Sequence, residues 1–118
     1  KETTASPTGT SLLAPISPSP ADLIERTLDR LSLGSHSVFV DLGCGDGRWL
    51  IAAAKRTGCT CVGFDLNADL LARGRAAAAE AGVSALVTLE ERDFVRDPPE
   101  ETLSCATHVV VYWNADPC

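Results

Sequence analysis

The stretch VFVDLGCGDGRWL, residues 38–50, decides the fold of this chain. Its first five residues are mainly apolar and β-branched, which is typical of a strand buried in a parallel sheet. Gly43, Gly45 and Gly47 follow at alternate positions, and an apolar pattern of helical period comes after them. Glycines permit positive φ and close approach of a ligand, and a helix N-terminus offers unpaired N–H groups to polar ligand groups. The stretch therefore predicts a strand, a ligand-binding turn and a helix.

Strands and helices alternate along the rest of the chain. Pro20 after Ser19 and Asn67 before an alanine-rich run are typical helix starts, and Gly34, Gly58 and Gly82 are typical ends. Helices are expected over residues 20–31, 49–56 and 68–81, strands over 38–42, 60–64, 85–89 and 107–113, and a loop or single helical turn over 98–101. This order predicts an α/β fold with βαβ units, right-handed crossovers and a parallel sheet.

Composition limits the classes of protein to which the chain belongs. With 118 residues, 45% of them hydrophobic, and a mean hydropathy of +0.08, it suits one small domain with a buried core. A net charge of −6 argues against nucleic-acid binding through a basic surface. No apolar run reaches the ~20 residues of a membrane span. Residues 1–18 are rich in Ser, Thr and Pro and predict a flexible arm before a domain over residues 19–118.

The five cysteines do not form a metal-binding pattern. No Cys-x-x-Cys pair occurs and the two histidines lack zinc spacing, so no metal site is expected. Free thiols in a reducing intracellular compartment, cytoplasmic or mitochondrial, are predicted. The chain begins at Lys1, so a removed targeting peptide stays open. Cys44 lies inside the glycine turn without a neighbouring histidine, and a nucleophilic role is not expected.

Acidic residues stand where the predicted strands end. Asp65 follows the strand over 60–64, and a carboxylate there is placed to bind both hydroxyls of a ribose. Helix capping is the alternative role, but Asn67 fills it better. Asp41 interrupts an apolar strand, where a carboxylate must be hydrogen-bonded or paired. Asp93 and Phe94 follow the third strand and are candidates for binding a ligand. The alternative is that Asp93 is a solvated loop acid and Phe94 a core phenylalanine.

The pattern D-x-G-x-G-x-G of residues 41–47 resembles motif I of class I S-adenosylmethionine-dependent methyltransferases and departs from the G-x-G-x-x-G of NAD-binding folds. The segments PISPSPADLIERTLDRL, VDLGCGDGRWLIAAA, VGFDLN and ATHVVVYW are similar to small protein-lysine methyltransferases. Those are related to the enzymes that modify the c-subunit of ATP synthase and the adenine nucleotide carrier. The resemblance implies a Rossmann-like fold, S-adenosylmethionine as cofactor and methyl transfer to a protein lysine.

The resemblance also implies roles for individual residues. Asp41 would lie near the methionine amino group, Leu66 would pack on the adenine, and Asp93 would accept from the adenine amino group beside Phe94. The full implied cofactor set is Asp41, Gly43, Cys44, Gly45, Gly47, Asp65, Leu66, Asn67, Asp93, Phe94 and Tyr112. Tyr112 and Asn114 are the candidates near the transferred methyl group, Trp113 stands where the family has leucine, and no general base is evident.

Class I domains have seven strands, and this chain supplies the first four, expected in the spatial order 3-2-1-4. We therefore expect a shortened protein or a piece of a longer one. Its apolar fourth strand would form an exposed edge that pairs with a second copy of the chain. A non-catalytic S-adenosylmethionine-binding module is one alternative. An NAD-dependent oxidoreductase half-domain is another, and the glycine spacing disfavours it.

Overall fold

The computed structural model describes residues 20–111. The predicted arm, the cap at Ser19 and the residues Tyr112, Trp113 and Asn114 lie outside this range. Helices and strands alternate within it, in the order α1 (Pro20–Leu31), β2 (Val38–Leu42), α2 (Arg48–Thr57), β3 (Thr60–Asp65), α3 (Ala68–Glu80), β4 (Val87–Glu91), α4 (Glu100–Cys105) and β5 (His108–Val111).

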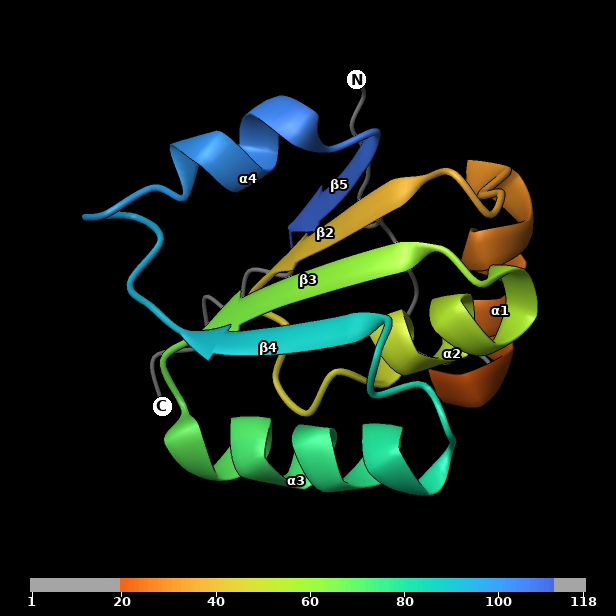
Figure 1. Cartoon of the computed structure of the whole chain (residues 1–118), viewed down its shortest axis with the longest axis horizontal. Coiled ribbons are helices and arrows are strands. Elements are labelled where there is room, and N and C mark those ends of the chain that lie inside the picture. The colour runs from red at the N-terminus through yellow and green to blue at the C-terminus, as the bar shows by residue number, and fades with distance from the viewer. Residues whose placement is uncertain (1–19, 112–118) are drawn as a thin grey trace.

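The strands form one parallel four-stranded sheet in the order β4-β3-β2-β5. Counted along the chain this is 3-2-1-4, which confirms the predicted topology. Two crossovers lead outward from β2 to β3 and β4, and the next returns past β2 to β5 (Figure 1). The order thus reverses between β2 and β5. In open α/β sheets, ligands bind at such a switch point, beyond the carboxyl ends of the strands.

The main core lies between the sheet and the helices α1, α2 and α3. Phe39 and Cys61 project from the central strands, and Leu50 and Leu71 project from α2 and α3, all with 0% exposure. Right-handed crossovers in opposite directions place α4 on the other face of the sheet (Figure 1). Within residues 20–111, no helix combines the length and hydropathy needed to cross a bilayer.

Apart from shifts of one residue at the ends of α2, β3, α3 and β5, element boundaries differ from the predictions at β4 and α4. Strand β4 begins at Val87, two residues later than expected, because the N–H of Leu86 donates to the Val83 carbonyl in a turn after α3. The strand also runs on to Glu91, which pairs with Asp65. The segment after Pro99 forms the six-residue helix α4 and not the expected loop or single turn.

Candidate functional site

The glycine turn is fastened to the end of the neighbouring strand. Gly43, Gly45 and Gly47 have φ values of 89°, 58° and 75°, a region that strains residues with a Cβ. The N–H groups of Gly43 and Cys44 both donate to the carbonyl oxygen of Phe64, at 2.8 and 3.1 Å. The turn therefore lies at the carboxyl ends of β2 and β3, as predicted.

Asp65 ties this turn to the start of α3. Its Oδ2 accepts from the N–H of Gly45 at 2.7 Å, and its Oδ1 accepts from the N–H of Asn67 at 2.9 Å. The Asn67 side chain in turn accepts from the N–H of Leu70, which confirms Asn67 as the helix cap. A carboxylate has about four acceptor positions, so each Asp65 oxygen keeps capacity for a further donor.

Asp41 is the buried polar side chain of this region. It is 2% exposed, and its Oδ1 has no hydrogen-bond partner. Burial, and secondarily the negative charge of Asp65, raise the pKa of Asp41 to about 7. A buried acceptor without a donor is costly. A ligand with a cationic or N–H group beside Oδ1 would relieve that cost.

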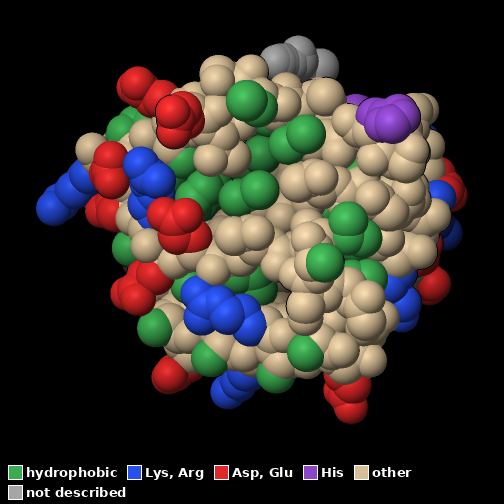
Figure 2. Space-filling view, viewed as in Figure 1, with side chains coloured by type: hydrophobic (Ala, Val, Ile, Leu, Met, Phe, Trp, Pro, Cys, Tyr) green, Lys and Arg blue, Asp and Glu red, His purple; other side chains and the backbone are tan. Residues whose placement is uncertain are grey.

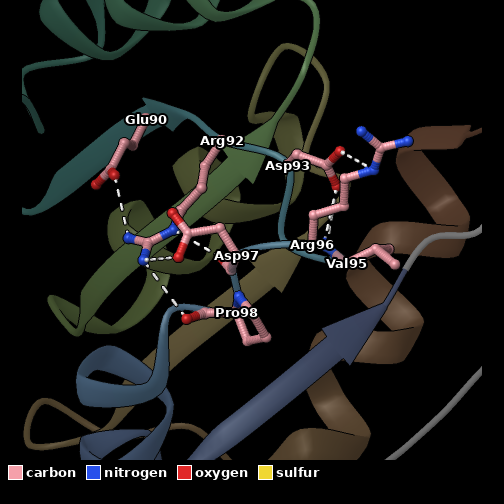
Figure 3. A network of polar contacts seen from close by, with 7 residues as sticks. All are labelled: Glu90, Arg92, Asp93, Val95, Arg96, Asp97 and Pro98. Carbon is pink, nitrogen blue, oxygen red and sulfur yellow. Dashed lines mark hydrogen bonds and ion pairs between the residues drawn. The ribbon is translucent and has the colours of Figure 1, made fainter.

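Asp93 and Phe94 lie in the loop that follows β4. The Oδ1 of Asp93 accepts from the N–H groups of Val95 and Arg96, at 3.1 and 3.2 Å, and its Oδ2 lies 3.7 Å from Nε of Arg96 (Figure 3). Asp93 thus stabilises its own loop through backbone hydrogen bonds. Both oxygens retain acceptor capacity, and Phe94 is half-buried.

Exposed apolar side chains gather near the carboxylates. Among the described residues, four large apolar side chains are exposed, and three of them follow or end strands at this edge: Leu66 at 63%, Val95 at 65% and Val111 at 50%. In Figure 2, hydrophobic side chains gather in the upper half of the view, where Figure 1 places α4 and β5, with acidic side chains to their left. Apolar surface beside acceptors suits a ligand with a flat ring and amino groups.

The similarity of this chain to known proteins identifies its family. A family model described as the ANTKMT methyltransferase domain matches residues 41–117. The chain belongs to this methyltransferase family. Its four-stranded sheet is accordingly the N-terminal part of a Rossmann-like class I methyltransferase fold.

Individual relatives agree with the family. A protein-lysine N-methyltransferase of Saccharolobus islandicus is 29% identical over 99 residues, 83% of this chain and 59% of that protein. The ATP synthase C-subunit lysine N-methyltransferase of Homo sapiens is 35% identical over 98 residues, 83% of this chain and 40% of that protein. This methyltransferase-family chain thus spans roughly half the length of the curated relatives that it matches.

Solved structures match the fold as well. An RNA methyltransferase from Salinibacter ruber, in complex with S-adenosyl-L-homocysteine, has a TM-score of 0.73 and 35% identity, covering 83% of this chain and 61% of that one. A methyltransferase from Geobacter sulfurreducens with the same ligand has a TM-score of 0.61 and 28% identity, covering 64% of this chain and 30% of that one.

Cys44 contributes backbone to the turn of this methyltransferase domain, while its side chain faces the core. A Cβ at Gly63 would lie 2.7 Å from its Sγ, which shows how closely it packs against β3. Burial, together with the nearby carboxylates, raises the pKa of Cys44 to about 12. A neutral buried thiol is inert. Cys44, Cys59, Cys61 and Cys105 are all free thiols, as predicted, and the described residues contain no cluster of metal-ligand type.

Sequence reasoning missed two residues that shape the site. Gly74, in the middle of α3, lies directly against the glycine turn: a Cβ there would come within 2.5 Å of the Asp46 carbonyl oxygen. Arg92 holds the loop after β4, with its guanidinium carbon 5.7 Å from the centre of the Phe64 ring. No sequence pattern pointed to either residue: Arg92 is a single basic residue before Asp93, and Gly74 is a single glycine in an alanine-rich helix.

Proposed function

We propose that the protein to which this chain belongs transfers a methyl group from S-adenosylmethionine to a protein lysine, and that residues 41–94 hold the cofactor. One observation carries the proposal: the Asp65 carboxylate binds the glycine turn directly, at the carboxyl ends of β2 and β3. The unpartnered Oδ1 of Asp41 lies in the same region. A partly exposed acceptor and a buried one thus lie near the carboxyl ends of β3 and β2, beside the point where the strand order reverses, and this supports the proposal.

The residues fit the cofactor group by group. Asp65 would accept from the ribose hydroxyls, and Asp41 would receive the amino group for which its buried Oδ1 lacks a donor. Asp93 would accept from the adenine amino group, with Leu66 and Phe94 as apolar walls. The cofactor supplies a methyl group on a sulfonium, which a nucleophile takes by in-line displacement. The protein's share is proximity and orientation.

The names of two relatives support a lysine acceptor. The Saccharolobus islandicus and Homo sapiens proteins described above are both lysine N-methyltransferases. The Salinibacter ruber structure is described as an RNA methyltransferase, which makes RNA the second candidate acceptor. A net charge of −6 disfavours RNA, because phosphate contacts need a basic surface. Labelled cofactor offered with protein and with RNA separates the two acceptors, and Tyr112 and Asn114 remain the proposed acceptor-side residues.

Asp65→Ala is expected to weaken binding of S-adenosylhomocysteine about tenfold or more, because two hydrogen bonds to a charged acceptor are lost. Titration calorimetry on both proteins measures this. Asp69→Ala is the matched control, since Asp69 is an exposed acid four residues after Asp65, in the first turn of α3. Equal affinity in wild type and Asp65→Ala would remove Asp65 from the site.

A separate titration with NADH, followed by its fluorescence, tests the oxidoreductase alternative. Binding of NADH in place of the adenosyl ligand would favour that alternative.

The sheet edge supports a separate proposal about assembly. Among the described strands, β5 pairs only with β2, and Val111 is half exposed. An uncovered apolar edge is a template for another strand. We propose that this chain, in isolation, pairs with a second copy through β5. Light scattering after size-exclusion chromatography is expected to give the mass of a dimer, and a monomer at all concentrations would exclude the pairing.

A further inference from the structure

We propose that Arg92 is a positioning residue that sets the base specificity of the site. It does so by fixing the position of the Asp93 loop relative to Asp65. The inference rests on the proposed function, because it concerns the adenine end of the same cofactor site. Arg92 is the last residue before the predicted adenine acceptor, and none of the cofactor contacts proposed above uses its side chain.

The guanidinium of Arg92 closes the loop on itself. Its Nε donates to the carbonyl oxygen of Asp97 at 2.9 Å, and its Nη2 donates to Asp97 Oδ1 at 3.3 Å and to the Pro98 carbonyl oxygen at 3.4 Å. Nη1 reaches Glu90 Oε2 at 3.4 Å (Figure 3). Arg92, at the start of the loop, therefore holds Asp97 and Pro98 at its far end. The planar guanidinium makes several hydrogen bonds at once, which a lysine ammonium cannot reproduce.

Arg92 also connects this loop to the carboxyl end of β3. Its guanidinium carbon lies 5.7 Å from the centre of the Phe64 ring, within cation–π range. Its own N–H donates to the carbonyl oxygen of Asp65 at 2.9 Å. The carbonyl of Phe64 in turn receives the N–H groups of Gly43 and Cys44. One residue thus links the glycine turn, the proposed ribose acceptor and the proposed adenine acceptor.

The side chain does not act by touching the ligand. In Figure 3 the side chains of Arg92 and Asp93 extend to opposite sides of the loop. Arg92 is 27% exposed, so its ion pairs are partly shielded from water and restrain the loop more than fully exposed pairs would. Without the Arg92 side chain, the hydrogen bonds of Asp93 to Val95 and Arg96 and the backbone hydrogen bond from residue 92 to Asp65 persist. The far end of the loop is no longer held, so the position of the Asp93 side chain relative to Asp65 is less fixed.

Base specificity is where this restraint should be measurable. A carboxylate accepts from the 6-amino group of adenine and repels the 6-carbonyl oxygen of hypoxanthine. Wild-type protein should therefore bind S-adenosylhomocysteine at least about tenfold more tightly than S-inosylhomocysteine. If the loop is no longer held in place, Asp93 discriminates less against hypoxanthine. The ratio of the affinity for S-adenosylhomocysteine to that for S-inosylhomocysteine should then fall.

The experiment is titration calorimetry with both nucleosides on wild type, Arg92→Ala and Arg92→Lys. The affinity ratio is expected to shrink at least about fivefold in Arg92→Ala and to shrink in Arg92→Lys as well, because lysine lacks the fork. Arg56→Ala is the matched control: Arg56 also bridges two carboxylates, Glu25 and Asp29 of α1, on a different part of the molecule. Its ratio should stay that of the wild type.

The outcomes separate the inference from the proposed function. A purely structural role for Arg92 would weaken both ligands equally and leave the ratio unchanged, which would overturn the inference while the proposed function stands. Wild-type protein that binds neither nucleoside would overturn the proposed function, and the inference with it. Should Arg92→Ala fail to fold, as judged by circular dichroism, Arg92→Lys decides by the same ratio.

Discussion

Replacing Gly74 with alanine is expected to destabilise the protein by about 2 kcal/mol, although alanine is the better helix former by about 1 kcal/mol. A Cβ at Gly74 would lie 2.5 Å from the carbonyl oxygen of Asp46 and 2.6 Å from Cδ1 of Leu89. The leucine methyl can rotate away, but the carbonyl belongs to the backbone of the glycine turn. Helix α3 and that turn must therefore move apart, and overpacking of this kind outweighs the gain in helix propensity.

Chemical denaturation followed by circular dichroism measures the free energy of unfolding of Gly74→Ala. The control is Gly34→Ala, because a Cβ at Gly34 meets nothing within 4 Å and its φ is not positive; that variant should be neutral or slightly stabilised. The displaced turn should also weaken binding of S-adenosylhomocysteine in Gly74→Ala. If Gly74→Ala unfolds at the same denaturant concentration as wild type, α3 does not rest on the turn as described.

The elements and their order were predictable because each depends on local signals. The apolar run before Gly43 and the caps at Asn67 and Gly58 lie within a few residues of what they determine, and the structure has them there. Sheet order followed from the resemblance of the motifs and agrees with the handedness of crossovers. The start of β4 was misplaced because apolar residues 85 and 86 look like a strand while the N–H of Leu86 is used in a turn.

Contacts between segments distant in sequence could not be predicted in this way. Gly74 reads as a weak point in an alanine-rich helix, and only the packing of α3 on the turn explains it. The strand-end rule predicted Asp65 at the carboxyl edge of the sheet, but not its hydrogen bond to Gly45, 20 positions earlier. Arg92 gives no pattern at all, because its partners depend on how the loop after β4 folds back.

Asp41 should make the unliganded protein less stable as the pH rises. Its pKa is 3.8 in an unfolded chain and about 7 in the folded protein, where burial and then the charge of Asp65 disfavour ionisation. Between these values the folded state holds a proton that the unfolded state has released, so stability falls with increasing pH. The fall runs from about pH 4 to about pH 7, and a difference of about 3 pKa units corresponds to as much as about 4 kcal/mol.

Denaturant unfolding of wild type and Asp41→Asn at pH 5.5 and pH 8 tests this. Asparagine keeps the shape and cannot ionise, so the stability difference between the two proteins should shift in favour of Asp41→Asn at the higher pH. The comparison between variants cancels other groups, such as Asp46, whose pKa is lowered by its hydrogen bond to Arg48 and which acts in the opposite direction. S-Adenosylhomocysteine, through its amino group, should reduce the pH dependence of the wild type alone. A pH-independent difference between the variants would mean that Asp41 is ionised, and has a donor, in the folded protein.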